Sequence, residues 1–525
     1  MSKKLLKSGL IVSVMTFISR ILGLLRDIVI ANLMGAGAAA DVFFFANKIP
    51  NFLRRLFAEG AFAQAFIPVL TEVQELGDKD RLRLFLARVS GTLGVIVTCV
   101  TIVGVIASPV LAAIFGTGWF IEYWSGGEQG DKFLMASAML KITFPYLWFV
   151  TLVGLSGAIL NTLNKFAVAA FTPVLLNVAI ISCALYLSPH MQEPAFALAW
   201  GVFLGGVLQL LFQLPFLWRA GVIVRPRWGW QDEYVVKIRK LIIPALFGVS
   251  VGQINLLLDT IIASFLVTGS IAWLYYSDRL LEFPLGLFGI AIATVILPTL
   301  SRNFVKENLE DFQNNMDWGI KMVCLLGIPA ATALALLAEP LILVLFQRGE
   351  FTLQTATLSS YSLIAYSTGL LSFMLVKVLA PGFYSRQDTK TPVRYGIYCM
   401  AANMLFNLIL VFSIGLEFGY IGLAVATSMS ALLNVVLLYQ KLHRQQVYRL
   451  SASTLLFMVK IVFSAAAMAF YLLWFGPELQ VWQEAPLQTR ILLMAKTIAI
   501  GAAIYFMGLL LCGVRLSHLK SHGAF

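Results

Sequence analysis

The chain has 525 residues, of which 59% are hydrophobic and only 12% are charged, and its formal net charge is +12. Soluble domains carry about 25% charged residues, so this composition excludes a soluble enzyme or binding module and predicts an integral membrane protein. The positive charge does not indicate nucleic-acid binding, because no basic patch belongs to a soluble domain. The five cysteines lie in or beside apolar segments without CxxC spacing, which argues against disulfides and zinc sites.

Fourteen apolar segments are each long enough to cross a bilayer, which takes about 20 residues. The opening segment contains Arg20 and does not have the features of a cleaved signal peptide. The second segment contains Lys48, Pro50, Arg54 and Arg55, so we expect a kinked or broken helix there. The predicted spans are 9–33, 40–72, 87–115, 133–155, 158–187, 195–217, 242–267, 272–300, 316–346, 356–380, 393–414, 419–440, 453–475 and 489–512.

Lysine and arginine residues gather on one side of this predicted bundle. The amino end and every second connection hold most of the 38 Lys and Arg residues, whereas the opposite connections hold only Lys132, Arg348 and Arg490. Cytoplasmic loops carry the excess of Lys and Arg in membrane proteins. The pattern therefore predicts that both termini are cytoplasmic.

Two sequence echoes indicate an internal duplication of six spans. Residues 45–71 align with residues 275–301, so that Pro68 meets Pro298, and a second echo relates FTPVLLN to KTPVRYG further along each half. An even number of spans per half makes the repeats parallel, with a site between them near mid-depth. The predicted parts are an N-terminal lobe (1–217), a basic cytoplasmic linker (218–241), a C-terminal lobe (242–440), and two additional helices with a cytoplasmic tail (441–525).

Four arginines lie within segments that otherwise look membrane-spanning: Arg20, Arg26, Arg54 and Arg279. A charge at the bilayer centre costs roughly 2.5–3.5 kcal/mol even on lenient scales, so such residues face a polar cavity or a partner. The planar guanidinium donates two parallel hydrogen bonds, which suits phosphate better than lysine does. Several arginines around one cavity therefore predict a site for a diphosphate.

A structural interpretation competes with this one at several residues. Arg26 can pair with the adjacent Asp27, and Arg279 can pair with Glu282, which lies three residues later on the same helix. Asp41 can serve as a helix N-cap. The sequence leaves both interpretations open.

A second polar set suits a hard cation. Asp259 lies in the middle of an apolar segment, Asn403 and Asn407 are four residues apart on one helical face, and Thr427 lies in a later span. Carboxylate, amide and hydroxyl oxygens bind hard cations, and Na⁺ is the natural candidate in a transporter. The alternative is that the asparagines hydrogen-bond between helices as packing contacts.

No catalytic motif is present. The four histidines lie in loops or the tail, and the chain has no Walker A lysine motif, nucleophile elbow or metalloprotease helix. We therefore expect a transporter rather than an enzyme, driven by an ion gradient, the membrane potential or substrate supply.

Four long segments resemble the MurJ (MviN) family of lipid II flippases, in the MOP exporter superfamily that includes the MATE transporters: SRILGLLRD, NKIPNFLRRLFAEGAFAQAFIPV, YYSDRLLEFPLG and LAPGFYSRQDTKTPV. The resemblance covers nearly the whole chain. It implies an all-α fold with fourteen transmembrane helices: two six-helix lobes and two further helices that form a groove. It also implies alternating access, which moves undecaprenyl-pyrophosphate-linked MurNAc-pentapeptide–GlcNAc from the cytoplasmic to the periplasmic leaflet of the bacterial inner membrane for peptidoglycan synthesis.

The resemblance also assigns roles to residues and partners. It implies that the substrate-binding residues are Arg20, Arg26, Arg54, Arg279, Asp41 and Glu59. Some members of the family bind sodium, and Asp259, Asn403, Asn407 and Thr427 fit that pattern. No other cofactor is expected. The implied partners are lipid II, membrane lipids and proteins of cell-wall synthesis.

Three other functions compete with a flippase of this kind. A MATE-like drug exporter or a polysaccharide-unit exporter has the same architecture, but a drug exporter needs acidic residues in its cavity. A membrane glycosyltransferase needs a large aqueous loop with carboxylates, and the sequence has none. A structural role in a division or elongation complex would tolerate replacement of Arg20 or Arg279 by alanine, whereas a flippase would lose translocation.

Overall fold

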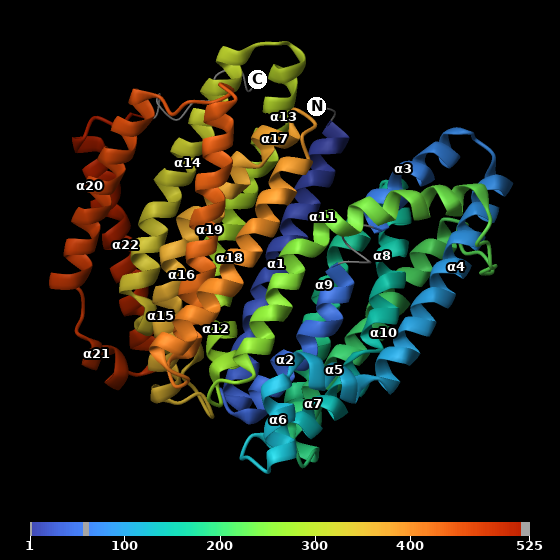
Figure 1. Ribbon diagram of the computed structural model, residues 1–525, viewed down its shortest axis with the longest axis horizontal. Helices are drawn as coiled ribbons and strands as arrows, with labels where there is room; N and C mark the ends of the chain where they lie inside the picture. The colour runs from blue at the N-terminus through green and yellow to red at the C-terminus, as the bar shows by residue number, and fades with distance from the viewer. Residues whose placement is uncertain (1–2, 56–61, 516–525) are drawn as a thin grey trace. The chain divides into compact units, whose positions relative to one another are not determined.

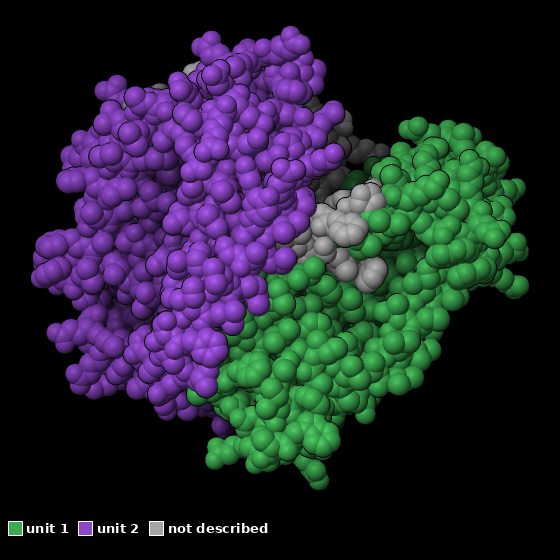
Figure 2. Space-filling view, in the orientation of Figure 1, with its two compact units in different colours: residues 1–272 green, residues 273–525 purple. Residues whose placement is uncertain are grey.

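The computed structural model describes the backbone of residues 3–55 and 62–515, and every regular element in those ranges is a helix (Figure 1). This confirms the prediction of an all-α fold. The chain divides into two compact units, Met1–Ala272 and Trp273–Phe525, which Figure 2 colours separately. Each unit is described by itself below.

Within its described residues, the first unit holds eleven α-helices. After α9 the chain continues through a π turn over Cys183–Leu187 and a 3₁₀ turn over Ser188–His190. The helices are α1 (Lys3–Met34), α2 (Ala38–Arg54), α3 (Phe62–Glu75), α4 (Lys79–Ile106), α5 (Ser108–Phe115), α6 (Thr117–Ser125), α7 (Gly130–Thr143), α8 (Tyr146–Thr162), α9 (Phe166–Ser182), α10 (Pro194–Arg219) and α11 (Glu233–Ala263).

The second unit holds the remaining helices, and α12 begins three residues before it. A π turn over Leu285–Gly289 follows α12. The helices are α12 (Ser270–Pro284), α13 (Ile290–Val305), α14 (Leu309–Leu336), α15 (Ala338–Phe346), α16 (Leu353–Leu379), α17 (Pro381–Tyr384), α18 (Lys390–Ile414), α19 (Gly419–Arg444), α20 (Ala452–Trp474), α21 (Leu479–Glu484) and α22 (Leu487–Leu511).

Eleven helices in the described part of the chain are long and apolar enough to cross a membrane. The predicted spans 9–33, 40–72 and 242–267 are not among them. Each of these three segments lies partly outside the residues or side chains that the structure describes. A multi-pass membrane protein is therefore confirmed, and the count of fourteen spans stays a prediction.

One predicted boundary is wrong. The connection between the fourth and fifth spans was expected near residues 156–157, but α8 continues to Thr162, and the turn follows at Asn164, whose φ of 60° is left-handed. Asparagine tolerates this conformation, and Lys165 follows it directly. The helix α4 begins at Lys79, eight residues before the predicted span, because the Asp78 side chain accepts hydrogen bonds from the first-turn N–H groups of Asp80 and Arg81. The charged first turns of α4 therefore precede the predicted span.

Each unit has its own hydrophobic core. In the first unit, Phe62, Phe66 and Phe85 pack with residues of α8 and the first turns of α11. In the second unit, residues of α13, α14 and α16 share one core with residues of α20 and α22. The two additional C-terminal helices are therefore built into the core of the second unit.

The helix bounds are consistent with the predicted duplication. The pair α2 and α3 covers one of the aligned segments, and the pair α12 and α13 covers the other. Pro68 lies within α3, and Pro298 lies at the aligned place within α13. The duplication itself stays a prediction.

Candidate functional site

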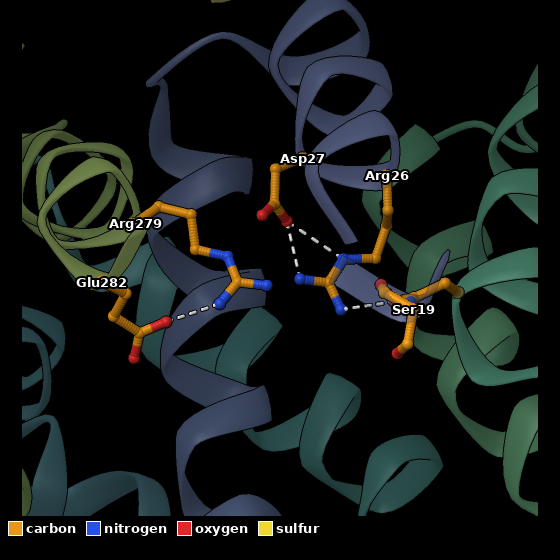
Figure 3. A network of polar contacts seen from close by, with 6 residues as sticks. Ser19, Arg26, Asp27, Arg279 and Glu282 are labelled. Carbon is orange, nitrogen blue, oxygen red and sulfur yellow. Dashed lines mark hydrogen bonds and ion pairs between the residues drawn. The ribbon is translucent and has the colours of Figure 1, made fainter. Parts of the chain in front are cut away.

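Arg26 of α1 is held by two partners. Its Nε and Nη2 atoms donate to the same oxygen of Asp27, at 3.0 and 2.7 Å, and its Nη1 donates to the side-chain oxygen of Asn177 on α9 at 3.1 Å (Figure 3). Asn177 in turn donates to the backbone oxygen of Ser19 at 3.2 Å. The Arg26 side chain is 14% exposed and Asp27 is fully buried. The pairing that the structural interpretation predicted is thus present, and a small part of the Arg26 side chain stays exposed.

Arg279 of α12 pairs with Glu282, one turn further along the helix. Its Nη1 donates to the carboxylate at 2.7 Å, and the two side chains are 30% and 45% exposed (Figure 3). Just before this arginine, the Ser277 hydroxyl is buried against α16, where it lies 2.6 Å from the backbone oxygen of Ser359 and 2.7 Å from the Ser362 hydroxyl. This serine contact fixes α12 against α16, so the backbone at Arg279 is held in place while its guanidinium stays partly exposed.

Of the other two arginines of the predicted site, Arg20 is exposed and Arg54 is partly buried. Arg20 lies on an exposed face of α1, and Arg54, at the end of α2, donates to the side-chain oxygen of Asn51 at 3.2 Å. Arg55 lies 3.5 Å from Gln253 of α11. Glu59, which we predicted to contact substrate, lies outside the described residues.

Asp41 of α2 is enclosed by donors. One oxygen lies 2.7 Å from the N–H of Gly269 and 3.1 Å from Lys132 Nζ, and the other lies 3.0 Å from the N–H of Ala272. Lys132 also donates to Gln129 at 3.1 Å, and both charged side chains are almost fully buried. Asp41 does not cap its own helix. It instead satisfies free N–H groups at the start of α12.

The four predicted sodium ligands lie on three helices, α11, α18 and α19. In the second unit, Asn403 and Asn407 are both fully buried on one face of α18, and Asn407 donates to the Asn403 side-chain oxygen at 3.0 Å. The Thr427 hydroxyl donates to its own helix α19. In the first unit, Asp259 accepts from Asn255 at 3.3 Å. These contacts are compatible with the packing interpretation, and the donor types still fit a hard cation.

Two residues of these networks were missed from the sequence. Lys132 was counted only as a loop charge, although it is one of three basic residues on the sparsely charged side of the predicted bundle. Asn177 ends the repeated segment FTPVLLN, which was read only as an echo. Both signals were present, but nothing in the sequence identified the distant partner of either residue.

Comparison with known proteins decides the family. The family model described as "Lipid II flippase MurJ" matches residues 30–487. The chain belongs to the MurJ family. It is 62% identical over 99% of its length to a protein of Vibrio cholerae named "Probable lipid II flippase MurJ", covering 98% of that relative. It is 37% identical over 98% of its length to the "Lipid II flippase MurJ" of Burkholderia cenocepacia, covering 99% of it.

Solved structures agree with this assignment. A lipid II flippase MurJ in an inward closed conformation matches 95% of this chain and 100% of its own, with a TM-score of 0.78 and 26% identity. An inward-facing MATE family transporter of the MOP superfamily matches 82% of this chain and 95% of its own, with a TM-score of 0.66 and 14% identity. The second likeness concerns the fold alone. It confirms the predicted MOP-type architecture. The relatives named above are transporters rather than enzymes.

Proposed function

We propose that this protein is a lipid II flippase of the inner membrane, which moves the lipid-linked peptidoglycan precursor between leaflets. The observation that carries the proposal is the match of the flippase family model over residues 30–487, together with relatives of that name along almost the entire chain. Lipid II joins a polyprenyl tail to a sugar–peptide head group through a diphosphate. The protein must therefore offer cationic hydrogen-bond donors to that diphosphate.

The arginines Arg20, Arg26, Arg54 and Arg279 are the proposed donors. Arg26 and Arg279 each hold a carboxylate by one side of the guanidinium while part of the side chain stays accessible. The Arg279–Glu282 pair is partly exposed, and such a pair contributes little net stability, about 0–1 kcal/mol. A diphosphate can therefore replace the Glu282 carboxylate at small cost, whereas Arg26 would bind it beside the buried Asp27. Asp41 is excluded from this set because its oxygens are already occupied by buried donors.

Alternating access completes the proposed cycle. Binding of the diphosphate neutralises the arginines in one state, and release in the other state resets them. A ligand can shift such an equilibrium only by binding the two states with different affinity. Both termini are assigned to the cytoplasm on the distribution of Lys and Arg residues.

Sodium coupling and protein partners are further parts of the proposal. Asp259, Asn403, Asn407 and Thr427 supply the oxygen atoms that a sodium ion prefers. The driving force would then depend on a sodium gradient, and D259N would remove that dependence. Association with proteins of cell-wall synthesis follows from the substrate and is otherwise a prediction.

Translocation of lipid II into vesicles of the purified protein tests the function. We expect accumulation in the far leaflet with wild-type protein and its loss in R279A. R302A replaces an exposed arginine on α13 and serves as the matched control. The measurement is repeated with and without a sodium gradient and a membrane potential. Equal translocation by vesicles without protein, or by R279A, would refute the proposal.

A further inference from the structure

The connection between α10 and α11 forms a strap that is fixed against α4. The strap is the segment 218–230, WRAGVIVRPRWGW, which includes the last two residues of α10. It contains three tryptophans, three arginines and no acidic residue, and Asp232 and Glu233 follow it. The N–H of Arg227 donates to the Ala87 backbone oxygen at 2.8 Å, and the N–H of Gly229 donates to the Thr92 hydroxyl at 3.0 Å. The strap therefore has a defined backbone position.

Besides these hydrogen bonds, close packing and an ion pair hold the strap against α4. A Cβ atom at Gly91 would lie 2.2 Å from the Arg227 backbone oxygen, so only glycine allows the strap to approach α4 this closely. Immediately after the strap, Asp232 pairs with Arg88 and caps α11 by accepting from the N–H groups of Tyr234 and Val235. The exposed side chains of the strap are thus presented by a rigid backbone.

The strap lies where α4 changes from polar to apolar. Arg88 is the last charged residue of α4, and the eighteen residues from Val89 to Ile106 contain no charge. The strap contacts α4 between Ala87 and Thr92, which is this transition. Tryptophan and arginine are typical of the membrane–water interface, and the strap is therefore at interfacial depth.

The tryptophans form an ordered, exposed surface at that depth. The rings of Trp228 and Trp230 stack with centroids 5.9 Å apart and an interplanar angle of 8°. Arg239 lies 3.8 Å from the Trp230 ring and also donates to the Trp230 backbone oxygen at 3.0 Å. Trp218 is 73% exposed and Trp228 is 58% exposed. Indole rings held in this way suit the boundary between lipid head groups and tails.

The beginning of α11 continues the same surface. Val235 and Ile238 face the core of the first unit, while Lys240 and Ile243 are exposed. In Figure 1 these first turns run across the first unit rather than along α4, α8 and α10. A helix with one buried face and an exposed face of basic and apolar residues is typical of interfacial helices.

We infer that the strap and the first turns of α11 bind anionic phospholipid head groups of the adjoining leaflet, with Arg225 and Arg227 as the phosphate ligands. Both arginines are exposed on an acid-free segment, and the tryptophans beside them enter the glycerol region. Exposed Trp and Arg side chains also occur at protein interfaces. The interfacial depth of the strap favours lipid as the occupant.

Native mass spectrometry of the full-length protein with phosphatidylglycerol and phosphatidylcholine tests this inference. Since each basic residue near an anionic surface strengthens binding about fivefold, R225Q/R227Q should weaken phosphatidylglycerol binding about 30-fold and leave phosphatidylcholine binding unchanged. R444Q/R449Q removes the same charge from exposed residues at the end of α19 and in the connection after it, and should bind phosphatidylglycerol as the wild type does.

A second readout reports the depth of the strap. In vesicles that contain brominated phosphatidylcholine, W228F/W230F should lose part of the tryptophan quenching seen in wild type. Unchanged phosphatidylglycerol binding by R225Q/R227Q would overturn the inference, because the occupant would then not be lipid. An equal loss in both arginine variants would also overturn it, because it would show only general attraction to basic residues. Unaltered quenching in W228F/W230F would place the strap outside the bilayer. This result would also overturn the inference.

Discussion

Two ion pairs of similar length serve different purposes in this molecule. Lys132 and Asp41 are 3.1 Å apart with side chains 5% and 2% exposed, whereas Arg279 and Glu282 are 2.7 Å apart with side chains 30% and 45% exposed. The first pair is surrounded by further donors and acceptors from two other segments. The second pair joins two residues of one helix. Burial, rather than distance, separates a structural charge from an accessible one.

The energetic consequences differ accordingly. Removing one member of a buried pair leaves the other charge without compensation and costs about 3–5 kcal/mol. Breaking a partly exposed pair costs about 0–1 kcal/mol. Charges of the first kind stabilise the fold, and charges of the second kind can exchange their partner for a ligand. The following variants test that distinction.

Replacement of Lys132 by methionine should have the largest effect on stability. Because Asp41 would stay buried without its cation, we expect the free energy of unfolding to fall by about 3–5 kcal/mol. Thermal unfolding of the purified protein in detergent measures the change. D41N/K132M, which removes both charges, should recover part of the loss. Wild-type stability in K132M would show that the pair has no structural role.

A second buried carboxylate allows the same test in the other unit. The Tyr448 hydroxyl donates to Asp317 of α14 at 2.5 Å, and both side chains are buried. Burial, and then the hydrogen bond to Asp317, raise the pKa of Tyr448, so the phenol stays protonated. Y448F leaves Asp317 without this donor and should cost about 1–3 kcal/mol of unfolding free energy. The exposed tyrosine variant Y186F, on the π turn after α9, is the control and should be neutral.

Replacement of Glu282 by glutamine should have a much smaller effect. The pair with Arg279 is partly exposed, so we expect a change in unfolding free energy below about 1 kcal/mol. Lipid II translocation should persist, because E282Q removes a carboxylate that competes with the diphosphate for the Arg279 guanidinium. The substitution does not remove a contact that the guanidinium needs for its position. Loss of translocation together with a large loss of stability in E282Q would place this pair in the structural class.

Replacement of Asp388 by asparagine should have the smallest effect on stability, and this effect should depend on pH. Burial raises its pKa, but hydrogen bonds from Thr391 and the charge of Arg386 outweigh burial, so the pKa lies below its usual value of 3.8. A carboxyl group whose pKa is lowered in the folded protein stabilises the fold at pH values above its ordinary pKa. This stabilisation is lost as the pH falls through the lowered pKa. D388N should therefore be less stable than wild type near neutral pH, and the difference should shrink as the pH falls below about 4. A difference that grows with acid would contradict the assignment.

The sequence predicted contacts between residues that are close together in the chain and missed contacts between residues that are far apart in it. The apolar segments follow from composition, and the pairs Arg26–Asp27 and Arg279–Glu282 follow from short spacing along one helix. The partner of Asp41 lies 91 residues away, at a residue that charge counting assigned to a loop. Only tertiary packing brings those two residues together. The turn at Asn164 was missed for a related reason, since hydropathy does not register a single left-handed residue.

The affinity of the purified protein for lipid II tests the central claim most directly. If the accessible arginines bind the diphosphate, R26A and R279A should each raise the Kd about tenfold to a hundredfold, as expected for loss of a charged hydrogen bond. The unfolding free energy of R279A should stay close to wild type, and that of R26A should fall because the buried Asp27 loses its cation. R302A should change neither quantity. A Kd for lipid II that is the same in wild type, R26A and R279A would contradict the account.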